Sequence, residues 1–246
     1  MNGDGPDRLA DDSNEMGFSL KRWMLATLTR RDLGLGQYDW KHLRFSYSQF
    51  GEDLIVGWLM EGRQGFYVDA GAFHPVRLSN TYKLYRRGWR GIVIDANPEF
   101  TATFRRRRPR DIVVNCAVSD TPGAAPFEVR TAGEFSGLQG FREEAGGPPV
   151  KRVVQVPVRT LASVLDEFLP PGQTVEYLNV DCEGADLAVL RSNDWQRCRP
   201  ALIAVEDFAP RAGSEICHWL AQQGYEFFAE AGVTRLFKRP DFQRRV

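Results

Sequence analysis

Short apolar segments recur along this chain, each ending in an acidic residue and followed by a stretch with helical periodicity. Residues 66–68, 91–94, 175–180 and 201–205 are such segments, and the residues that end them are Asp69, Asp95, Asp181 and the pair Glu206 and Asp207. Alternating strands and helices are joined by right-handed crossovers, which give a mostly parallel sheet. Ligands of such sheets bind beyond the carboxyl ends of the strands. The sequence therefore predicts a ligand site at one sheet edge, where acidic side chains gather.

The other periodic segments complete an α/β fold. Helical patterns cover residues 48–60, 79–87, 97–108, 160–169, 184–190 and 215–223, and a further strand covers residues 112–114. Residues 127–129 and 153–158 alternate like an added hairpin, and residues 225–229 and 234–238 form a closing antiparallel hairpin around Ala231 and Gly232. We expect a mostly parallel sheet with an antiparallel C-terminal hairpin and helices on both faces.

The chain divides into three parts. Residues 1–16 are polar and rich in Asp, Asn and Gly, which predicts a disordered tail. Residues 17–45 predict a helical extension, whose apolar stripe would dock on the protein's own domain or on a second subunit of a homo-oligomer. Residues 46–240 form the main domain. Within it, the segment 131–151 carries five glycines and two prolines between two strands, which predicts a substrate lid.

Composition excludes several classes of protein. The 32 Lys and Arg residues balance the 32 Asp and Glu residues, so net charge does not favour a nucleic-acid partner. No apolar run approaches the ~18–20 residues that span a bilayer, which predicts no transmembrane segment. The polar N-terminus lacks the apolar core of a secretion signal. Four cysteines with no C-x-x-C pair indicate reduced thiols, and hence a cytoplasmic protein.

The end of the first strand favours a nucleoside ligand without a phosphate. Asp69 is followed by Ala70 and Gly71, but Phe73 and Val76 stand where a dinucleotide fingerprint needs its second and third glycines. S-adenosylmethionine has no phosphate and needs only one glycine for close approach of the chain. Asp69 would bind its ammonium group, directly or through a water molecule.

Other strand ends supply the remaining parts of such a site. Asp95 ends the second strand and would accept hydrogen bonds from both ribose hydroxyls. Ser79 and Asn80 begin a predicted helix, whose free N–H groups would suit the carboxylate of the methionine part. Backbone groups around Ala117, after the third strand, would lie along the adenine.

Six stretches of the sequence together resemble the FkbM family of methyltransferases. They are SQFGED at residues 48–53, residues 66–75, SNTY at 79–82, RGWRG at 87–91, IDANP at 94–98 and YLNVDCEG at 177–184. The resemblance covers roughly residues 46–210 and implies the seven-stranded, Rossmann-like sheet of class I methyltransferases. It also implies S-adenosylmethionine as cofactor, with Gln49, Asp69, Gly71, Ser79, Asn80 and Asp95 at cofactor positions. His74 and Pro75 depart from the family pattern, which often has a second glycine there.

The resemblance further implies methyl transfer to oxygen, commonly to a hydroxyl of a sugar or a polyketide. We therefore expect an O-methyltransferase whose acceptor is a small molecule or a glycan, including glycosylated natural products. An NAD-dependent sugar oxidoreductase or epimerase, and a non-catalytic module that binds S-adenosylmethionine, are the alternatives.

An alcohol needs a base or a metal ion to lose its proton. Asp181 and Glu183 follow the fourth strand, where the methyl group should point, and His74 lies near the cleft, so these three are the candidate catalytic residues. Asp181, Glu206 and Asp207 are candidate ligands for Mg²⁺. Metal-assisted catalysis and base catalysis without a metal both remain open. The run of arginines at residues 105–108 is interpreted as a solvated helix face.

Overall fold

A computed structural model describes residues 44–141 and 148–244 of the chain. The chain forms two compact units, residues 1–45 and 46–246. The predicted tail and nearly all of the predicted helical extension lie outside the described residues, as does the oligomer contact expected there. Among the described residues, no helix is both long and apolar enough to cross a membrane. The larger unit contains every other element discussed below.

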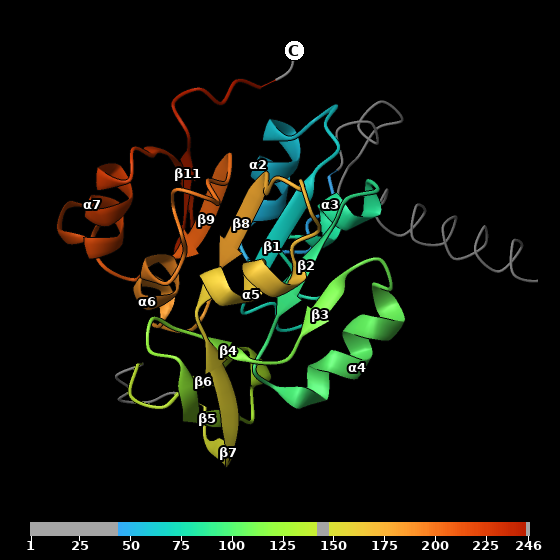
Figure 1. The fold of residues 1–246 in the computed structure, drawn as a ribbon, viewed down its shortest axis with the longest axis vertical. Helices are drawn as coiled ribbons and strands as arrows, with labels where there is room; N and C mark the ends of the chain where they lie inside the picture. Colours follow the sequence, from blue (N-terminus) through green and yellow to red (C-terminus); the bar gives the residue numbers. More distant parts are fainter. Residues whose placement is uncertain (1–43, 142–147, 245–246) are drawn as a thin grey trace, which may run out of the picture. The chain divides into compact units, whose positions relative to one another are not determined.

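The larger unit contains a seven-stranded sheet in the order β10-β11-β9-β8-β1-β2-β3 (Figure 1). Its strands are β1 (Phe66–Ala70), β2 (Arg90–Ile94), β3 (Ile112–Val114), β8 (Tyr177–Val180), β9 (Leu202–Glu206), β10 (Glu226–Ala231) and β11 (Thr234–Lys238). β11 pairs antiparallel with both β9 and β10, and the other pairs are parallel. The predicted mostly parallel sheet with an antiparallel C-terminal hairpin is confirmed.

Helices cover both faces of this sheet, as expected. They are α2 (Glu52–Leu59), α3 (Tyr82–Arg86), α4 (Pro98–Arg107), α5 (Leu161–Phe168), α6 (Asp186–Arg191) and α7 (Glu215–Gln222). One buried cluster joins the sheet to α5, α6 and α7, through Leu161, Val189 and Leu220. A second cluster joins its other face to α2, α3 and α4. Side-chain caps at Asn97, Thr160 and Ser214 fix the starts of α4, α5 and α7.

Two helices begin three or more residues later than predicted. α2 begins at Glu52 rather than at residue 48, because Gly51 adopts a left-handed conformation with φ of 88° and interrupts the helical path. α3 begins at Tyr82 rather than at residue 79. Residues 79–81 form a turn in which the side chains of Asn80 and Thr81 bond to the neighbouring strands instead of continuing a helix.

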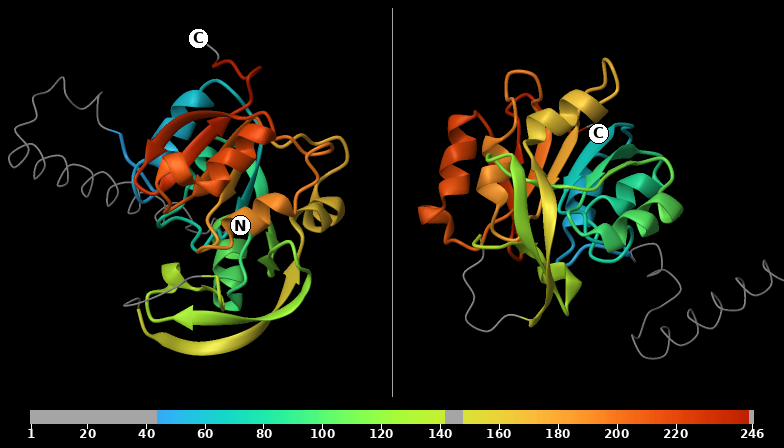
Figure 2. Two further views of the ribbon diagram at one scale, coloured as in Figure 1. Left: turned by 90° about the vertical axis from the view of Figure 1, so that its left-hand side faces the viewer. Right: turned by 60° about the horizontal axis from the view of Figure 1, so that its bottom comes forward.

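A second, four-stranded sheet in the order β4-β7-β5-β6 stands beside the first. It consists of β4 (Ala117–Val118), β5 (Gly123–Arg130), β6 (Gly137–Leu138) and β7 (Val150–Arg159), and a 3-10 turn at Gly133–Phe135 precedes β6. Figure 2 shows β5 and β7 side by side as a long curved ribbon. The added hairpin is thus confirmed and longer than predicted. Part of the loop 131–151 is ordered, because β6 pairs with β5.

Candidate functional site

A cavity of about 410 Å³ opens at the carboxyl ends of β1, β2, β8 and β9. It is closed on its other sides by residues from the start of α2, from β4, β5 and β6, and from the turn before β11. Most of the predicted site residues line it, namely Gln49, Asp69, Gly71, Asn80, Asp95, Ala117, Asp181, Glu183 and Glu206. The expected ligand edge of the sheet is therefore a cavity large enough for a nucleoside ligand.

Backbone conformation marks this cavity as a constrained site. The non-glycine residues with positive φ in the described ranges are Phe73, Leu78 and Glu183, with φ of 50°, 54° and 53°. All three line the cavity. Such conformations cost free energy and persist where the surrounding structure holds them, often at functional sites.

Gly71 lets two strand ends approach each other. Its φ is 81°, and a Cβ atom placed there would lie 1.6 Å from the carbonyl oxygen of Asp181. No other residue fits without moving the backbone of β1 or β8. The glycine predicted from the sequence therefore keeps the floor of the cavity open where β1 and β8 end.

Asp69 is held rigidly at the end of β1. Its carboxylate accepts hydrogen bonds from the Thr81 hydroxyl at 2.5 Å and from the Asn179 amide at 2.9 Å. Burial raises the pKa of Asp69, while nearby Arg108 and these hydrogen bonds lower it. Asn179 also accepts a hydrogen bond from the Asn80 amide at 3.0 Å. Asp69, Thr81, Asn179 and Asn80 therefore form one buried polar chain along the cavity wall.

Asp95 organises the loops that follow β1 and β2. Its two carboxylate oxygens accept hydrogen bonds from the backbone N–H groups of Phe73 at 2.8 Å and Asn97 at 2.7 Å. Burial raises its pKa to about 6, although both bonds lower it. Phe73 and Phe100 meet edge to face with centroids 5.0 Å apart and line the cavity. Together with Ala117 on β4, they provide an apolar slot next to Asp95.

The SQFGED segment places Gln49 at the cavity. Asp53 accepts hydrogen bonds from the Ser46 and Ser48 hydroxyls and from the Tyr47 backbone N–H. Glu52 accepts a hydrogen bond from the Phe50 backbone N–H at 2.8 Å. These bonds fix the turn before α2, so Gln49 and Phe50 reach the cavity lining.

Three carboxylates converge at the ends of β8 and β9. Asp181, Glu183 and Glu206 each offer an oxygen within 4.8 Å of the others. Burial raises the pKa of Asp181 well above its usual value, and the neighbouring carboxylates of Asp186 and Glu183 raise it further. A carboxyl group of this kind accepts a proton near neutral pH more readily than an ordinary aspartate does.

The cavity lining is acidic. Among the described residues, no lysine, arginine or histidine lines it, whereas seven residues with carboxylate side chains do. These are Glu52, Asp69, Asp95, Glu134, Asp181, Glu183 and Glu206.

Asp207 is not a member of the carboxylate cluster, which corrects the ligand set expected from the sequence. Its carboxylate forms an ion pair with Arg235 and accepts hydrogen bonds from the Ser214 hydroxyl and the Ala209 backbone N–H. Consecutive residues of a strand point to opposite faces, so only Glu206 of this pair reaches the cavity. Glu183 takes the third position instead.

His74 and Ser79 bond to nearby backbone groups and lie outside the cavity lining. The Nδ1 atom of His74 accepts hydrogen bonds from the backbone N–H groups of Val76 at 3.1 Å and Arg77 at 2.9 Å. The imidazole is not part of the cavity lining, and burial together with Arg77 and Arg107 lowers its pKa. Ser79 accepts a hydrogen bond from the Tyr82 backbone N–H at 3.1 Å and likewise lies outside the lining.

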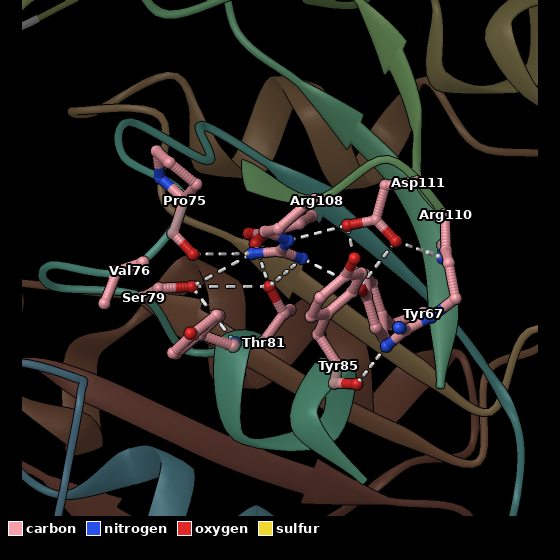
Figure 3. Close-up of polar contacts among 12 residues, drawn as sticks. Tyr67, Pro75, Val76, Ser79, Thr81, Tyr85, Arg108, Arg110 and Asp111 are labelled. Carbon is pink, nitrogen blue, oxygen red and sulfur yellow. Dashed lines mark hydrogen bonds and ion pairs between the residues drawn. The ribbon is translucent and has the colours of Figure 1, made fainter. Parts of the chain in front are cut away.

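Arg108 is fully buried, which corrects the interpretation of residues 105–108 as a solvated face. Figure 3 shows its guanidinium surrounded by Asp111, the hydroxyls of Tyr67, Ser79 and Thr81, and the carbonyl of Pro75. Arg108 donates to Thr81, and Thr81 donates to Asp69. Arg105, Arg106 and Arg107 are exposed as expected.

The methyltransferase FkbM domain matches residues 69–227, well over half of the chain. The chain belongs to the FkbM methyltransferase family. It is therefore a methyltransferase that uses S-adenosylmethionine, with the class I fold whose strand order the sheet follows.

Solved structures with a similar fold share little sequence with this FkbM protein. A methyltransferase from Geobacter sulfurreducens is 12% identical, with 92% of this chain and 95% of that chain covered and a TM-score of 0.44. The O-methyltransferase TomG from Streptomyces achromogenes, involved in tomaymycin synthesis and solved in complex with SAM, is 12% identical, with 86% of each chain covered and a TM-score of 0.40. Among curated proteins, none matches the chain.

Several residues of the FkbM site were missed in the sequence. Asn179 pairs in register with Asp69 and holds its carboxylate, and Phe73, Phe100 and Phe208 line the cavity. Asn179 had a recognisable signal, because it is an amide residue between Leu178 and Val180 in a strand that is fully buried. The phenylalanines had none, since an aromatic residue near a strand end is more often part of the core.

Proposed function

We propose that this protein transfers a methyl group from S-adenosylmethionine to a hydroxyl of a sugar, a glycan or a glycosylated natural product. The observation that carries this proposal is the group of Asp181, Glu183 and Glu206 in the same cavity as the donor-site residues. A hydroxyl is a poor nucleophile, and carboxylates with a raised pKa are suited to remove its proton.

The residues present fit the donor. S-adenosylmethionine supplies an electrophilic methyl group on a sulfonium. Gly71 leaves room for a ligand against the backbone where β1 and β8 end, because a Cβ atom there would collide with Asp181. Asp95 and the slot beside Phe73 and Phe100 would hold the ribose and the adenine. Asp69, Asn80 and Gln49 would hold the methionine part through its ammonium group.

Asp181 and Glu183 would act on the acceptor. As the new bond to carbon forms, the hydroxyl loses its proton to a carboxylate, and the cluster shares that proton. The left-handed conformation of Glu183 and the glycine after it place this side chain at the cavity rather than in α6. Positioning of the two reactants contributes much of the acceleration in such a displacement.

A bound Mg²⁺ is the second candidate role for the same cluster. Carboxylate oxygens are the ligands that Mg²⁺ prefers, and Asp181, Glu183 and Glu206 offer three. The ion would lower the pKa of the acceptor hydroxyl. If the ion is required, EDTA should abolish turnover and added Mg²⁺ should restore it. Full activity in the presence of EDTA would support base catalysis without a metal ion.

Aromatic side chains support a sugar as the acceptor. Phe50 and Phe208 line the cavity with 48% and 60% of their surfaces exposed. Apolar rings next to carboxylates suit a ligand with an apolar face and hydroxyl groups at its edge. The residues 133–138 also line the cavity, which supports a lid role for this part of the loop 131–151. The free thiols at the four cysteines agree with a cytoplasmic site of action.

The test is Asp181→Asn in an assay of labelled methyl transfer to a panel of sugar acceptors. This change keeps the shape of the side chain and removes its ability to accept a proton. We expect turnover to fall by about 100-fold or more while donor binding, measured by calorimetry, stays within a few-fold. Glu226→Gln, on the exposed edge strand β10, is the matched control and should leave both unchanged. Unaltered turnover in the Asp181→Asn variant would show that Asp181 takes no part in catalysis. A failure of the wild-type protein to bind the donor would support the NAD-dependent alternative, whereas donor binding without transfer to any acceptor would support the non-catalytic one.

A further inference from the structure

Exposed arginines gather on the side of the sheet that α3 and α4 cover. Both helices pack on the same face of the sheet, through Leu84 and Phe104. Arg110 joins the ends of the two helices, because its guanidinium donates to the backbone carbonyl of Tyr85 at 2.5 Å (Figure 3). The exposed arginines on and beside these helices, called the arginine face below, are Arg77, Arg86, Arg105, Arg106, Arg107 and Arg110.

No carboxylate of the described residues forms an ion pair with the arginine face. From residue 70 to residue 110 the only acidic residues are Asp95 and Glu99. Asp95 accepts hydrogen bonds from two backbone N–H groups at the cavity, and Glu99 pairs with Arg152 at 2.7 Å. Arg191 and Arg197, beside α6 on the opposite face of the sheet, each pair with a carboxylate. The positive charge of the arginine face is therefore left for a partner.

The arginines of this face are held in place without losing their charge. Arg86 donates to a tyrosine hydroxyl and Arg110 to a backbone carbonyl, and both acceptors are neutral. The guanidinium of Arg110 lies 3.9 Å from the ring centroid of Tyr85, and that of Arg77 lies 5.3 Å from the ring centroid of Phe73. Stacking on a ring orients the guanidinium plane, whose fork of N–H donors matches a carboxylate or a phosphate. Such a surface suits discrete anionic groups.

The arginine face adjoins the cavity at the loop of residues 73–78. Phe73 and Leu78 of this loop line the cavity, whereas Arg77 is exposed and lies against the Phe73 ring. A ligand that extends from the cavity past this loop therefore meets the arginines. Because the cavity itself is lined by carboxylates, anionic groups of such a ligand would lie outside it, on the arginine face.

The arginine face lacks apolar anchors among the described residues. The large apolar side chains that are exposed in the described ranges all lie outside residues 70–110. Surfaces that bind a lipid bilayer commonly combine basic residues with apolar side chains that enter it. A face with charge and planar donors alone favours a hydrophilic polyanion.

We propose that the arginine face binds an acidic glycan, a sugar chain with carboxylate or phosphate groups, and that one hydroxyl of this chain enters the cavity as the methyl acceptor. The role of the chain as acceptor rests on the proposed function, whereas its binding to the face does not. In the transfer, the hydroxyl oxygen bonds to the methyl carbon and loses its proton, and the electrons of the broken bond stay on sulfur.

Calorimetry on the full chain without donor tests the binding. Oligogalacturonate carries a carboxylate on each sugar, a phosphomannan oligosaccharide carries phosphates, and dextran carries neither. We expect at least one acidic probe to bind and dextran not to bind. Binding should weaken at high salt, because salt screens charges on an exposed surface. The acidic probe that binds identifies the anionic group.

Two matched double variants locate the binding surface. Arg77→Gln combined with Arg107→Gln removes two charges beside the loop 73–78 and should weaken binding of the acidic chain by about 10-fold. Arg191→Gln combined with Arg197→Gln removes the same charge on the opposite face and should leave the affinity unchanged. All four side chains are exposed, so the melting temperature should stay the same in both.

Several outcomes would overturn this inference and leave the proposed function standing with a neutral acceptor. They are failure of both acidic probes to bind, equal binding of dextran, and equal loss of affinity in the two double variants. Binding of phosphatidylglycerol vesicles or of single-stranded DNA without either acidic glycan would overturn it in favour of a membrane or a nucleic acid. Methyl transfer from labelled donor to the bound acidic chain would support both proposals. Binding of that chain without transfer to any acceptor would support the binding surface and contradict the proposed function.

Discussion

Arg108 joins segments that are far apart in the sequence through one fully buried charge. It bonds to Tyr67 on β1, to Ser79 and Thr81 before α3, and to Asp111 before β3. Removing one partner of a buried ion pair leaves the other charge uncompensated. We therefore predict that Arg108→Met lowers the free energy of unfolding by about 3–5 kcal/mol in urea denaturation.

Arg106→Met is the matched control for this prediction. Arg106 lies in the same run of arginines but is exposed and forms no ion pair with another described residue. Its replacement should change stability by no more than about 0.5 kcal/mol. Equal losses in both variants would show that the buried network contributes nothing specific.

Replacing Gly71 tests whether the donor site needs the close approach of the ends of β1 and β8. The comparison with another glycine of positive φ separates this steric effect from the cost of the backbone conformation. Gly71→Ala would place a methyl group 1.6 Å from the Asp181 carbonyl oxygen, so β1 and β8 would have to move apart. We expect donor affinity, measured by calorimetry, to fall by at least about 100-fold, the scale of losing a few kcal/mol of binding.

Gly62→Ala provides the comparison, because Gly62 has a φ of 68° but no atom lies within 4 Å of its added Cβ. It carries only the conformational cost, about 1–2 kcal/mol of stability. Donor affinity should survive in Gly62→Ala. If both variants bind the donor normally, the close approach at Gly71 is not required for the site.

The predictability of the site from sequence differs from residue to residue. Asp69, Gly71 and Asp95 follow apolar strands, so local pattern alone placed them at the cavity. The choice between Glu206 and Asp207 depends on which face of β9 meets the ligand, and that is set by the neighbouring strands. The burial of Arg108 could not be predicted from the local sequence, because most of its partners lie far from it in the chain. They are at positions 67, 75, 79, 81 and 111.

At the scale of elements, the turn Gly133–Phe135 and the strand β6 form one wall of the cavity. A Cβ atom added at Gly137 would lie 3.1 Å from the Cβ of Glu183, so this wall packs against the carboxylate cluster. We predict that donor binding slows hydrogen exchange at the amides of residues 134–138, because a ligand in the cavity would hold this segment. Hydrogen-exchange mass spectrometry would measure it.

The amides of α5 (Leu161–Phe168) are the internal reference for that measurement, since none of its residues lines the cavity. They should exchange equally with and without donor. Equal exchange at residues 134–138 in both states would mean that the segment does not respond to ligand, and would count against a lid role.

The strands were predicted more reliably than the helix starts, and the reason is physical. Strand cores depend on a local run of buried residues, which the sequence displays directly. The start of α3 depends on the side chains of Asn80 and Thr81, which bond to β8, to β1 and to Arg108 after α4. Contacts of that kind join distant parts of the chain and leave no local signal. The local periodicity of the sequence therefore predicts a helix that begins at residue 79.

At the scale of the whole molecule, buried carboxyl groups make stability depend on pH. Burial raises the pKa of both Asp95 and Asp186 to about 6. The folded protein therefore binds these protons more tightly than the unfolded chain does. Their contribution to stability is full below the unfolded pKa of about 4 and is lost as the pH rises through about 6.

A cationic donor should reverse this trend, because it favours the ionised carboxylates. We predict that the increase in melting temperature caused by S-adenosylmethionine grows between pH 5 and pH 7.5. A gain of 1 kcal/mol corresponds to about 2–4 °C for a protein of this size. Differential scanning calorimetry at several pH values would measure it. A constant increase across this range would contradict the assignment of Asp95 to the donor site.

The walls of the cavity come from almost the full length of the larger unit, from Gln49 to Val233. Asp69 on the central strand meets its partner Asn179 only 110 residues later, and β11 inserts between β9 and β10. A chain emerging from the ribosome therefore exposes β1 long before the strand that completes its pairing has been made. No nascent fragment that stops before residue 233 has all the walls of the cavity, so a ligand that needs the complete cavity cannot assist folding until residue 233 has been made.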